Sequence, residues 1–233
     1  PLADFVRSAD AVILMKGIPS TGKQVPVIGM GTFKVFEIGG DMALRDQHTE
    51  VMRTFFDMGG GMIDSSPMYT VAEDVIGYAL EKIGHPQGLI SSTKVWNTTS
   101  DRSRVQFEKS LQSWDVDAFD IFMVHNVDVW QEHVDTVKSY KESREIRYLG
   151  ISTSHGREAT ELERLMETEP LDFVQLTYNI LDRTVEDRLL PLAQERGIAI
   201  MANRPFQGGE LFKHIANQPL PAWSAEIDCS NWA

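Results

Sequence analysis

Cysteine is almost absent from the 233-residue sequence. Cys229 is the single one, so no disulfide can form within the chain and no cysteine-rich metal site can be built. His48 and His155 have no partner at metal-ligand spacing, and we expect both on the surface or in loops, with no metal bound. Any chemistry is therefore expected from other polar side chains.

Long apolar runs are also missing. No stretch approaches the roughly 18 residues of a membrane-spanning helix. The run "AVILM" at 11–15 is too short for the hydrophobic part of a signal sequence, and we expect it inside the fold. The sequence begins at Pro1 without a methionine, which indicates a processed or engineered N-terminus. A cytoplasmic location is favoured, and an exported, periplasmic form stays open.

Positive charge is scarce. The chain has 22 lysines and arginines against 34 aspartates and glutamates, which gives a formal net charge of −12. This balance argues against nucleic acid or an anionic membrane as the main partner. Hydrophobic residues make up 42% and charged residues 24%, the composition of an ordinary globular protein. We expect residues 1–233 to form a single domain, a monomer or weak oligomer, that acts on a small molecule.

Short β-rich runs alternate with amphipathic helical stretches. The helical pattern is clear at 50–58, 71–84 and 101–114, where apolar residues such as Phe107 and Leu111 recur at helical spacing. The β-rich runs lie at 26–31, 61–65, 89–96, 119–125, 146–152, 172–178 and 198–206. Strand followed by helix, seven times over, predicts a parallel sheet with right-handed crossovers.

Two architectures fit this pattern, an open doubly wound sheet and a (β/α)₈ barrel of the TIM type. A doubly wound sheet concentrates its site at one switch point, whereas a barrel collects side chains from every strand at its C-terminal mouth. Six successive strands end in a polar side chain, and no GxGxxG motif follows the first strand, so we favour the barrel. These strand-end residues are Asp64, Lys94, His125, Ser152, Gln175 and Asn203.

The two ends of the chain depart from a plain barrel. Two short runs at 11–17 and 23–29, joined by the turn "PSTG", predict an N-terminal β-hairpin that covers the bottom of the barrel. Only seven strands are expected where a closed barrel needs eight, because 207–215 reads as a loop or short helix and 219–233 as the start of another helix. We therefore expect the last βα unit to be missing and the natural protein to continue.

Several motifs resemble those of the aldo-keto reductase family. The stretches "MIDSSPMY", "SSTKVW" and "FMVHN" are similar to that family's aspartate, tyrosine, lysine and histidine motifs, in the same order. "VIGMGTF", "IRYLGIS" and "FVQLTYN" also match, and the resemblance runs from about residue 17 to the C-terminus. It implies a (β/α)₈ barrel that transfers hydride from a nicotinamide cofactor, usually NADPH and alternatively NADH, to an aldehyde or ketone.

The resemblance gives four residues a catalytic role. Hydride arriving at a carbonyl carbon leaves negative charge on the oxygen, which needs a proton from a general acid. Tyr69 would be this acid, and Lys94 would lower the pKa of its phenol by stabilising the phenolate. Asp64 would hold Lys94 through a charge-assisted hydrogen bond, and His125 would bind and orient the carbonyl oxygen.

Cofactor contacts are also implied by the resemblance. Ser152 and Gln175 should hydrogen-bond the nicotinamide carboxamide, and Thr153 stands where the family usually has asparagine after that serine. The loop "ANRPFQGGELF" resembles the family loop over the cofactor pyrophosphate. Its expected contact residues are Asn203, Arg204, Pro205, Phe206 and Gly208. The family's basic residues for the cofactor's 2′-phosphate follow the eighth strand, so the choice between NADPH and NADH cannot be read from this sequence.

Three aromatic residues on loops at the expected mouth suggest a pocket for apolar or aromatic carbonyl compounds: Phe33, Trp96 and Trp130. Two other functions stay open. The barrel could be a cofactor-binding regulatory module without significant turnover. It could also be a Schiff-base enzyme that uses Lys94 as the nucleophile.

Overall fold

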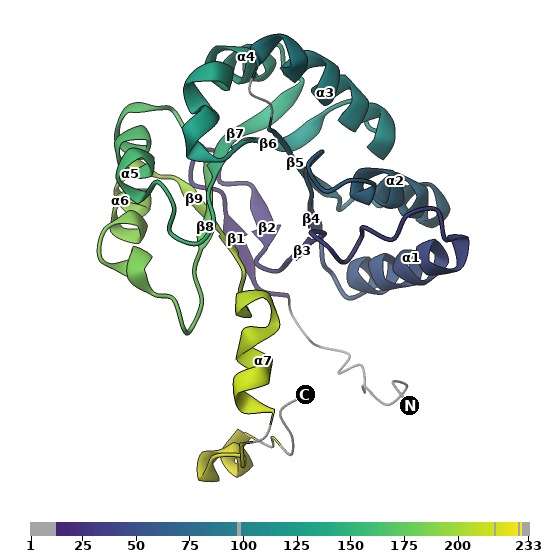
Figure 1. Cartoon of the computed structure of the whole chain (residues 1–233), viewed down its shortest axis with the longest axis vertical. Coiled ribbons are helices and arrows are strands. Elements are labelled where there is room, and N and C mark those ends of the chain that lie inside the picture. Colours follow the sequence, from purple (N-terminus) through teal and green to yellow (C-terminus); the bar gives the residue numbers. More distant parts are fainter. Residues whose placement is uncertain (1–12, 97–98, 217, 228, 230–233) are drawn as a thin grey trace.

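A curved sheet of seven parallel strands forms the centre of the molecule, with helices around its outside (Figure 1). The computed structural model describes residues 13–96, 99–216, 218–227 and 229. Each strand pairs with the next one along the chain, from β3 to β9, and within the described residues β3 and β9 do not pair with each other. The strands are β3 (Gly29–Gly31), β4 (Met62–Asp64), β5 (Ile90–Val95), β6 (Phe119–His125), β7 (Ile146–Ser152), β8 (Phe173–Thr177) and β9 (Ala199–Asn203). The prediction of a barrel-type fold is confirmed, with seven strands in the described part of the chain.

Helices follow the strands, and all but the last of them cover the outer face of the sheet (Figure 1). They are α1 (Met42–Asp57), α2 (Ala72–Ile83), α3 (Ser100–Trp114), α4 (Trp130–Glu142), α5 (Ala159–Thr168), α6 (Leu189–Arg196) and α7 (Glu210–Ile215). Short 3₁₀ turns are η1 (Val127–Val129), η2 (Thr184–Glu186), η3 (Gln207–Gly209) and η4 (Ala222–Ile227). The segment at 207–215 is the expected short helix, whereas the described part of 219–233 forms a 3₁₀ turn.

Helix α1 begins eight residues before the expected start at residue 50. The carboxylate of Asp41 accepts hydrogen bonds from the backbone N–H groups of Ala43 and Leu44. This cap satisfies donors that the first helical turn leaves without partners. In the first half of the helix the apolar residues are exposed and the one buried residue is Thr49, so hydrophobic spacing alone placed the start of the helix too late.

The N-terminal hairpin consists of β1 (Met15–Gly17) and β2 (Gln24–Pro26), paired antiparallel. It covers the bottom of the barrel, as expected: Lys23 forms an ion pair of 3.3 Å with Asp120, and Thr21 Oγ1 lies 2.9 Å from the Tyr148 hydroxyl. The expectation that 11–15 is inside the fold is wrong for its described part, since residues 13–15 are exposed. The hairpin instead buries Ile18 and Val25 in the barrel interior.

Side chains alternate between the interior and the helix-covered face of each strand, as the pleat requires. Along β5, Ile90 belongs to the interior cluster, Thr93 bonds outward to Glu73 of α2 with an O–O distance of 2.6 Å, and Lys94 points inward to Asp64. The lower interior is apolar, with members that include Met62, Ile121, Met123, Tyr148 and Phe173. The polar residues at the strand ends point inward like these apolar residues, because they follow them at even spacing along each strand. The alternation therefore brings the polar side chains together above the apolar cluster.

Helices α2 and α3 approach each other most closely at Gly77. A Cβ atom at this position would lie 1.8 Å from the backbone oxygen of Ser113. Helix propensity alone favours alanine over glycine by about 1 kcal/mol. The Cβ atom would collide with backbone, which cannot rotate away as a side chain can. The steric cost of alanine therefore outweighs its higher helix propensity.

We therefore expect Gly77→Ala to lower the free energy of unfolding by about 3 kcal/mol or more, at the upper end of overpacking effects. Urea denaturation measures this directly. Gly40→Ala is the control, because Gly40 is exposed and nothing lies within 4 Å of the added Cβ. A Gly77→Ala protein as stable as the Gly40→Ala protein would contradict the close approach of the two helices.

Candidate active site

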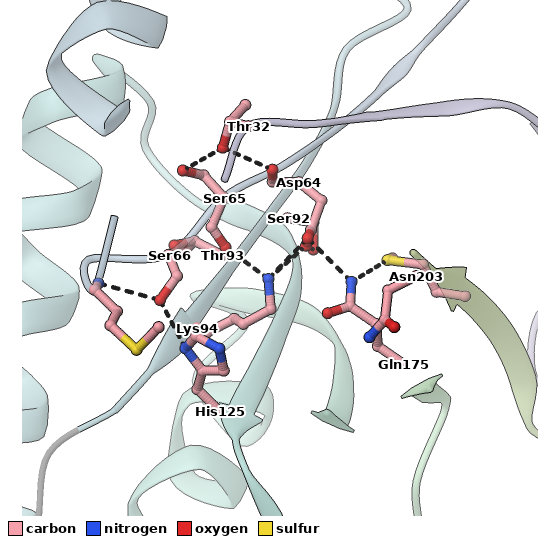
Figure 2. A network of polar contacts seen from close by, with 12 residues as sticks. Thr32, Asp64, Ser65, Ser66, Ser92, Thr93, Lys94, His125, Gln175 and Asn203 are labelled. Carbon is pink, nitrogen blue, oxygen red and sulfur yellow. Dashed lines mark hydrogen bonds and ion pairs between the residues drawn. The ribbon is translucent and has the colours of Figure 1, made fainter. Parts of the chain in front are cut away.

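A buried ion pair between Lys94 and Asp64 lies at the C-terminal end of the strands (Figure 2). The Lys94 ammonium is 2.9 and 2.8 Å from the two carboxylate oxygens of Asp64 and 2.7 Å from the backbone oxygen of Ser65. These three acceptors match its three N–H donors. Lys94 is fully buried, at 0% exposure, and a buried ammonium requires such complete pairing. The predicted contact between Asp64 and Lys94 is thus present.

Two further donors hold the Asp64 carboxylate. Ser92 Oγ donates to Oδ1 over 2.8 Å from the neighbouring strand β5. Gln175 Nε2 donates to Oδ2 over 3.0 Å from β8, across the barrel. Donors from two strands, β5 and β8, therefore fix the carboxylate, and its orientation fixes that of the Lys94 side chain.

Tyr69 lies on the loop between β4 and α2, with its ring beside this ion pair. The Lys94 ammonium is 5.6 Å from the ring centroid. The ring also packs edge-on against His125, with 5.8 Å between centroids, and against Phe33 at 5.0 Å. Tyr69, Lys94, Asp64 and His125, predicted from four separate motifs, come together at one end of the barrel.

The expected lowering of the Tyr69 pKa is not what the structure gives. Burial raises the pKa of the phenol, and the negative charges of Asp64 and Glu37 add to the rise. The charge of Lys94 acts in the expected direction and lowers the pKa, but burial outweighs it. Tyr69 is therefore protonated at neutral pH, in the state that a proton donor needs.

His125 ends β6 and is neutral over the physiological pH range. Burial lowers the pKa of its imidazole to about 3, and the positive charges of Lys94 and Arg157 contribute. Its Nδ1 atom lies 2.9 Å from Ser66 Oγ, and its Nε2 atom has no hydrogen-bond partner among the described residues (Figure 2). A neutral ring with one nitrogen held and the other available can donate a hydrogen bond to a ligand oxygen.

The residues expected to hold the nicotinamide end of a cofactor lie on the next two strands, β7 and β8. Ser152 is directly opposite His125 in the β6–β7 ladder, and Gln175 is opposite Ser152 in the β7–β8 ladder. The Ser152 hydroxyl oxygen is buried without a hydrogen-bond partner among the described residues. By contrast, Gln175 Nε2 already bonds Asp64 and lies 2.8 Å from Met201 Sδ.

Thr153 and Asn203 bond to the chain itself. The Thr153 hydroxyl donates to the backbone oxygen of Arg157 over 2.8 Å. Asn203 Nδ2 donates to the backbone oxygen of Thr153, and its Oδ1 accepts from Thr177 Oγ1, both over 2.8 Å. The Asn203 side chain thus joins the ends of β7, β8 and β9, and the cofactor contacts of both residues stay predictions.

The loop after β9 places the Arg204 guanidinium next to Gly208. Arg204 has a buried Nε without a hydrogen-bond partner among the described residues, and its Nη2 would be 3.3 Å from a Cβ at position 208. Gly208 has φ of +65°, so a side chain there would be both crowded and strained. Pro205 and Phe206 lie between them, and the Phe206 ring is exposed and packs at 4.9 Å from Phe212.

The three predicted pocket aromatics divide into two kinds. Phe33 and Trp96 are 46% and 43% exposed, and Phe33 contacts the Tyr69 ring. Trp130 is only 1% exposed, which corrects its assignment to an open pocket. It begins α4, and its indole packs in the core between the helices and the sheet.

Three buried polar residues, two in the site and one behind it, were missed by sequence reasoning. Ser92 precedes Lys94 by two residues, so its inward direction could have been read from the strand alternation. Ser66 follows Asp64 by two residues on a loop, where no periodic pattern predicts direction. Glu73 is buried behind β5, where Ser110 and Trp114 of α3 donate to it, and burial raises its pKa.

The described residues contain no helix long and apolar enough to cross a bilayer. Among the same residues, no cluster of three or more histidine, cysteine or acidic side chains could bind a metal ion.

Comparison with known proteins gives a consistent result. Residues 27–223 match the family model described as "Aldo/keto reductase family". The NADH-specific methylglyoxal reductase of Escherichia coli is 28% identical, over 89% of this chain and 72% of that protein. A crystal structure of an aldo/keto reductase from Klebsiella pneumoniae in complex with NADP and acetate superimposes with a TM-score of 0.71 at 27% identity, covering 85% of this chain and 71% of that one.

The aldo-keto reductase YhdN of Bacillus subtilis is also 28% identical, over 79% of this chain. The match covers 59% of that relative, so the chain spans less than two thirds of its length.

The Lys94–Asp64 pair yields a prediction about stability. Asp64→Ala leaves a buried ammonium without its counterion, so we expect a loss of about 3–5 kcal/mol in the free energy of unfolding. Adding Lys94→Met removes the unpaired charge and should recover part of the loss. Urea denaturation of the two single variants and the double variant measures the coupling.

Glu161→Ala is the control for this cycle, because Glu161 pairs with Arg164 on the exposed face of α5. Its loss should be far smaller than that of Asp64→Ala, because water screens an exposed ion pair. The buried-pair assignment is wrong if Asp64→Ala costs no more than Glu161→Ala.

Proposed function

The chain belongs to the aldo/keto reductase family, and we propose that it reduces the carbonyl group of a small aldehyde or ketone to an alcohol. One observation carries this proposal. A protonated phenol, a neutral imidazole and a buried ammonium–carboxylate pair converge at the mouth of the barrel. This set contains a proton donor, a second hydrogen-bond donor and a cation for the phenolate left behind.

The residues present fit a nicotinamide dinucleotide. Ser152 offers a buried hydroxyl that no described residue bonds, beside Gln175, which suits a carboxamide that both donates and accepts hydrogen bonds. Next to Gly208, Arg204 offers a buried guanidinium nitrogen that has no partner in the described part of the chain, which suits a phosphate group. NADP is the cofactor found in the Klebsiella structure, and the E. coli relative is named as NADH-specific. We therefore propose NADPH, with NADH as the alternative.

The chain's own residues would bind the carbonyl and deliver the proton. When bound, the cofactor supplies the hydride that the carbonyl carbon receives. His125 donates to the carbonyl oxygen from Nε2 and orients it, and Tyr69 donates its phenolic proton as negative charge develops there. An alkoxide is much more basic than a phenolate, so this transfer is favourable even from a phenol of raised pKa. The Lys94 ammonium then stabilises the phenolate, while Asp64 keeps Lys94 in place.

A Schiff-base role for Lys94 is disfavoured by its surroundings. A nucleophilic amine needs a free lone pair and access to the substrate. Lys94 is completely buried, and three acceptors hold its ammonium. A purely regulatory role does not require the four catalytic residues to meet, and here they do.

Small carbonyl compounds are the substrates we propose. The named substrates of two relatives are methylglyoxal and glyoxal, both small dicarbonyl compounds. Phe33 and Trp96 are partly exposed and would supply apolar surface at the mouth.

The role of Tyr69 is tested by Tyr69→Phe, which removes the proton donor and retains the ring packing. We expect kcat for NADPH-dependent reduction of methylglyoxal to fall by about 100-fold or more, because general acid catalysis contributes a factor of this order. Cofactor affinity, followed by fluorescence titration, should change little.

Tyr78→Phe is the matched control, since Tyr78 lies on α2 and bonds the surface residue Asp46. A Tyr69→Phe enzyme that keeps most of the wild-type rate would refute the general-acid assignment. Absence of reduction by the wild-type protein across a panel of aldehydes, ketones and sugars would refute the proposed function itself.

The pH dependence of kcat/KM follows from the two perturbed pKa values. His125 stays neutral down to its pKa of about 3, so we expect no change of activity from its protonation between about pH 5 and 8. Tyr69 must be protonated to act, so activity should be lost only as pH rises through its pKa, which burial raises above the ordinary value of a tyrosine.

Initial rates measured across this range check the expectation. The same profile in His155→Gln serves as the control, because His155 is an exposed histidine in the loop after β7. A midpoint near pH 6.5 in both proteins would contradict a neutral His125.

A further inference from the structure

Ser66 lies on the loop between β4 and α2, between the catalytic candidates Asp64 and Tyr69. It is completely buried. Its Oγ atom is 2.9 Å from Nδ1 of His125 and accepts a hydrogen bond of 3.2 Å from the backbone N–H of Met68 (Figure 2). Its backbone oxygen accepts from the N–H of Tyr69 over 2.9 Å. One turn therefore joins the proposed proton donor to the residue that contacts the histidine.

The direction of the Ser66–His125 bond follows from counting donors and acceptors. A serine hydroxyl has one hydrogen to donate and two lone pairs to accept with. The N–H of Met68 uses one lone pair. If Nδ1 carried the proton, it would donate to the second lone pair, and the buried hydroxyl hydrogen would have no acceptor among its contacts with the described residues.

In the opposite arrangement Ser66 donates to an unprotonated Nδ1 of His125. The hydroxyl hydrogen then has an acceptor, so the cost of a buried donor without a partner is avoided. A neutral imidazole with an unprotonated Nδ1 carries its proton on Nε2. His125 is in this neutral state, because burial and the nearby charges of Lys94 and Arg157 lower its pKa to about 3.

We propose that Ser66 is a positioning residue that holds His125 in the tautomer with its proton on Nε2, so that this nitrogen donates to the reacting carbonyl oxygen. The link to a carbonyl oxygen rests on the proposed function, whereas the tautomer itself does not. With the other tautomer, Nε2 would present a lone pair to the carbonyl oxygen and repel it. Ser66 thus determines whether the site offers two hydrogen-bond donors or one.

Nitrogen-15 NMR of the imidazole rings tests the tautomer in the full chain without added ligand. The chain has 6 histidines, and the signals lost in His125→Asn assign His125. In the wild-type protein at pH 7 we expect a protonated Nε2 and an unprotonated Nδ1. Ser66→Ala should shift the ring toward the Nδ1-protonated form, and Ser66→Thr, which keeps the hydroxyl, should restore the wild-type signals.

Kinetics with NADPH and methylglyoxal test the consequence. We expect Ser66→Ala to lower kcat/KM by about tenfold, the factor typical of one hydrogen bond, with wild-type pH dependence between about pH 5 and 8. Ser66→Thr should recover most of this loss. A merely structural role for Ser66 would lower stability without moving the tautomer.

The chain supplies a matched control in a second buried serine–histidine pair, Ser103 and His133, on α3 and α4. Ser103→Ala should change the signals of His133 and leave those of His125 and kcat/KM as in the wild type. That outcome would show that the loss of kcat/KM in Ser66→Ala comes from the Ser66–His125 pair.

Two results would overturn the proposal: a protonated Nδ1 on His125 in the wild-type protein, or an unchanged His125 tautomer in Ser66→Ala. The first needs no variant, so it decides the matter even if a variant fails to fold. A tautomer shift in Ser66→Ala together with no carbonyl reduction by the wild-type protein would support the role of Ser66 and refute the proposed function.

Discussion

Burial of the Lys94 ammonium is the constraint on which the rest of the site depends. A cation out of contact with water is tolerated only when carboxylate and carbonyl oxygens replace its hydration. Here Asp64 and the backbone of Ser65 provide three acceptors, all from the end of β4. Asp64 must in turn be fixed, and donors from β5 and β8 hold it. The barrel is thus tied across its interior by the contacts that one buried charge demands.

The same charge sets the protonation states around it. Burial and the Lys94 cation both disfavour a second positive charge on His125, so the imidazole is neutral. Burial and Lys94 act in opposite directions on Tyr69, and burial is the larger, so the phenol keeps its proton. A neutral hydrogen-bond donor and a protonated acid beside one permanent cation form a site in which negative charge can develop on a ligand oxygen at little electrostatic cost.

Much of this arrangement could be predicted from the sequence, because strand alternation and strand order are local patterns. Asp64, Lys94, His125 and Gln175 each end a β-rich run in the inward phase, and parallel pairing brings those ends together. The predictions failed where loop conformation or depth of burial determines the direction of a side chain or its pKa. Trp130 is aromatic and follows a strand end, as a pocket residue would. It is the first residue of α4, however, and the orientation of this helix places its side chain in the core. The pKa of Tyr69 rose because the net effect of burial and charge depends on depth, which no motif encodes.

Ser152 and Gln175 were predicted as one pair of cofactor contacts, but their surroundings differ. The Ser152 hydroxyl is buried without a partner among the described residues, so a ligand that bonds it displaces no protein contact. Gln175 must release Asp64 or Met201 before its amide N–H groups can bond elsewhere. Asp64 would still keep Lys94 and Ser92 after losing that donor, so the exchange leaves no charged group unpaired. In the proposed cofactor site, Ser152 would therefore be the preformed contact and Gln175 the exchangeable one, and binding there would be coupled to the hydrogen bonds that hold the Lys94–Asp64 pair.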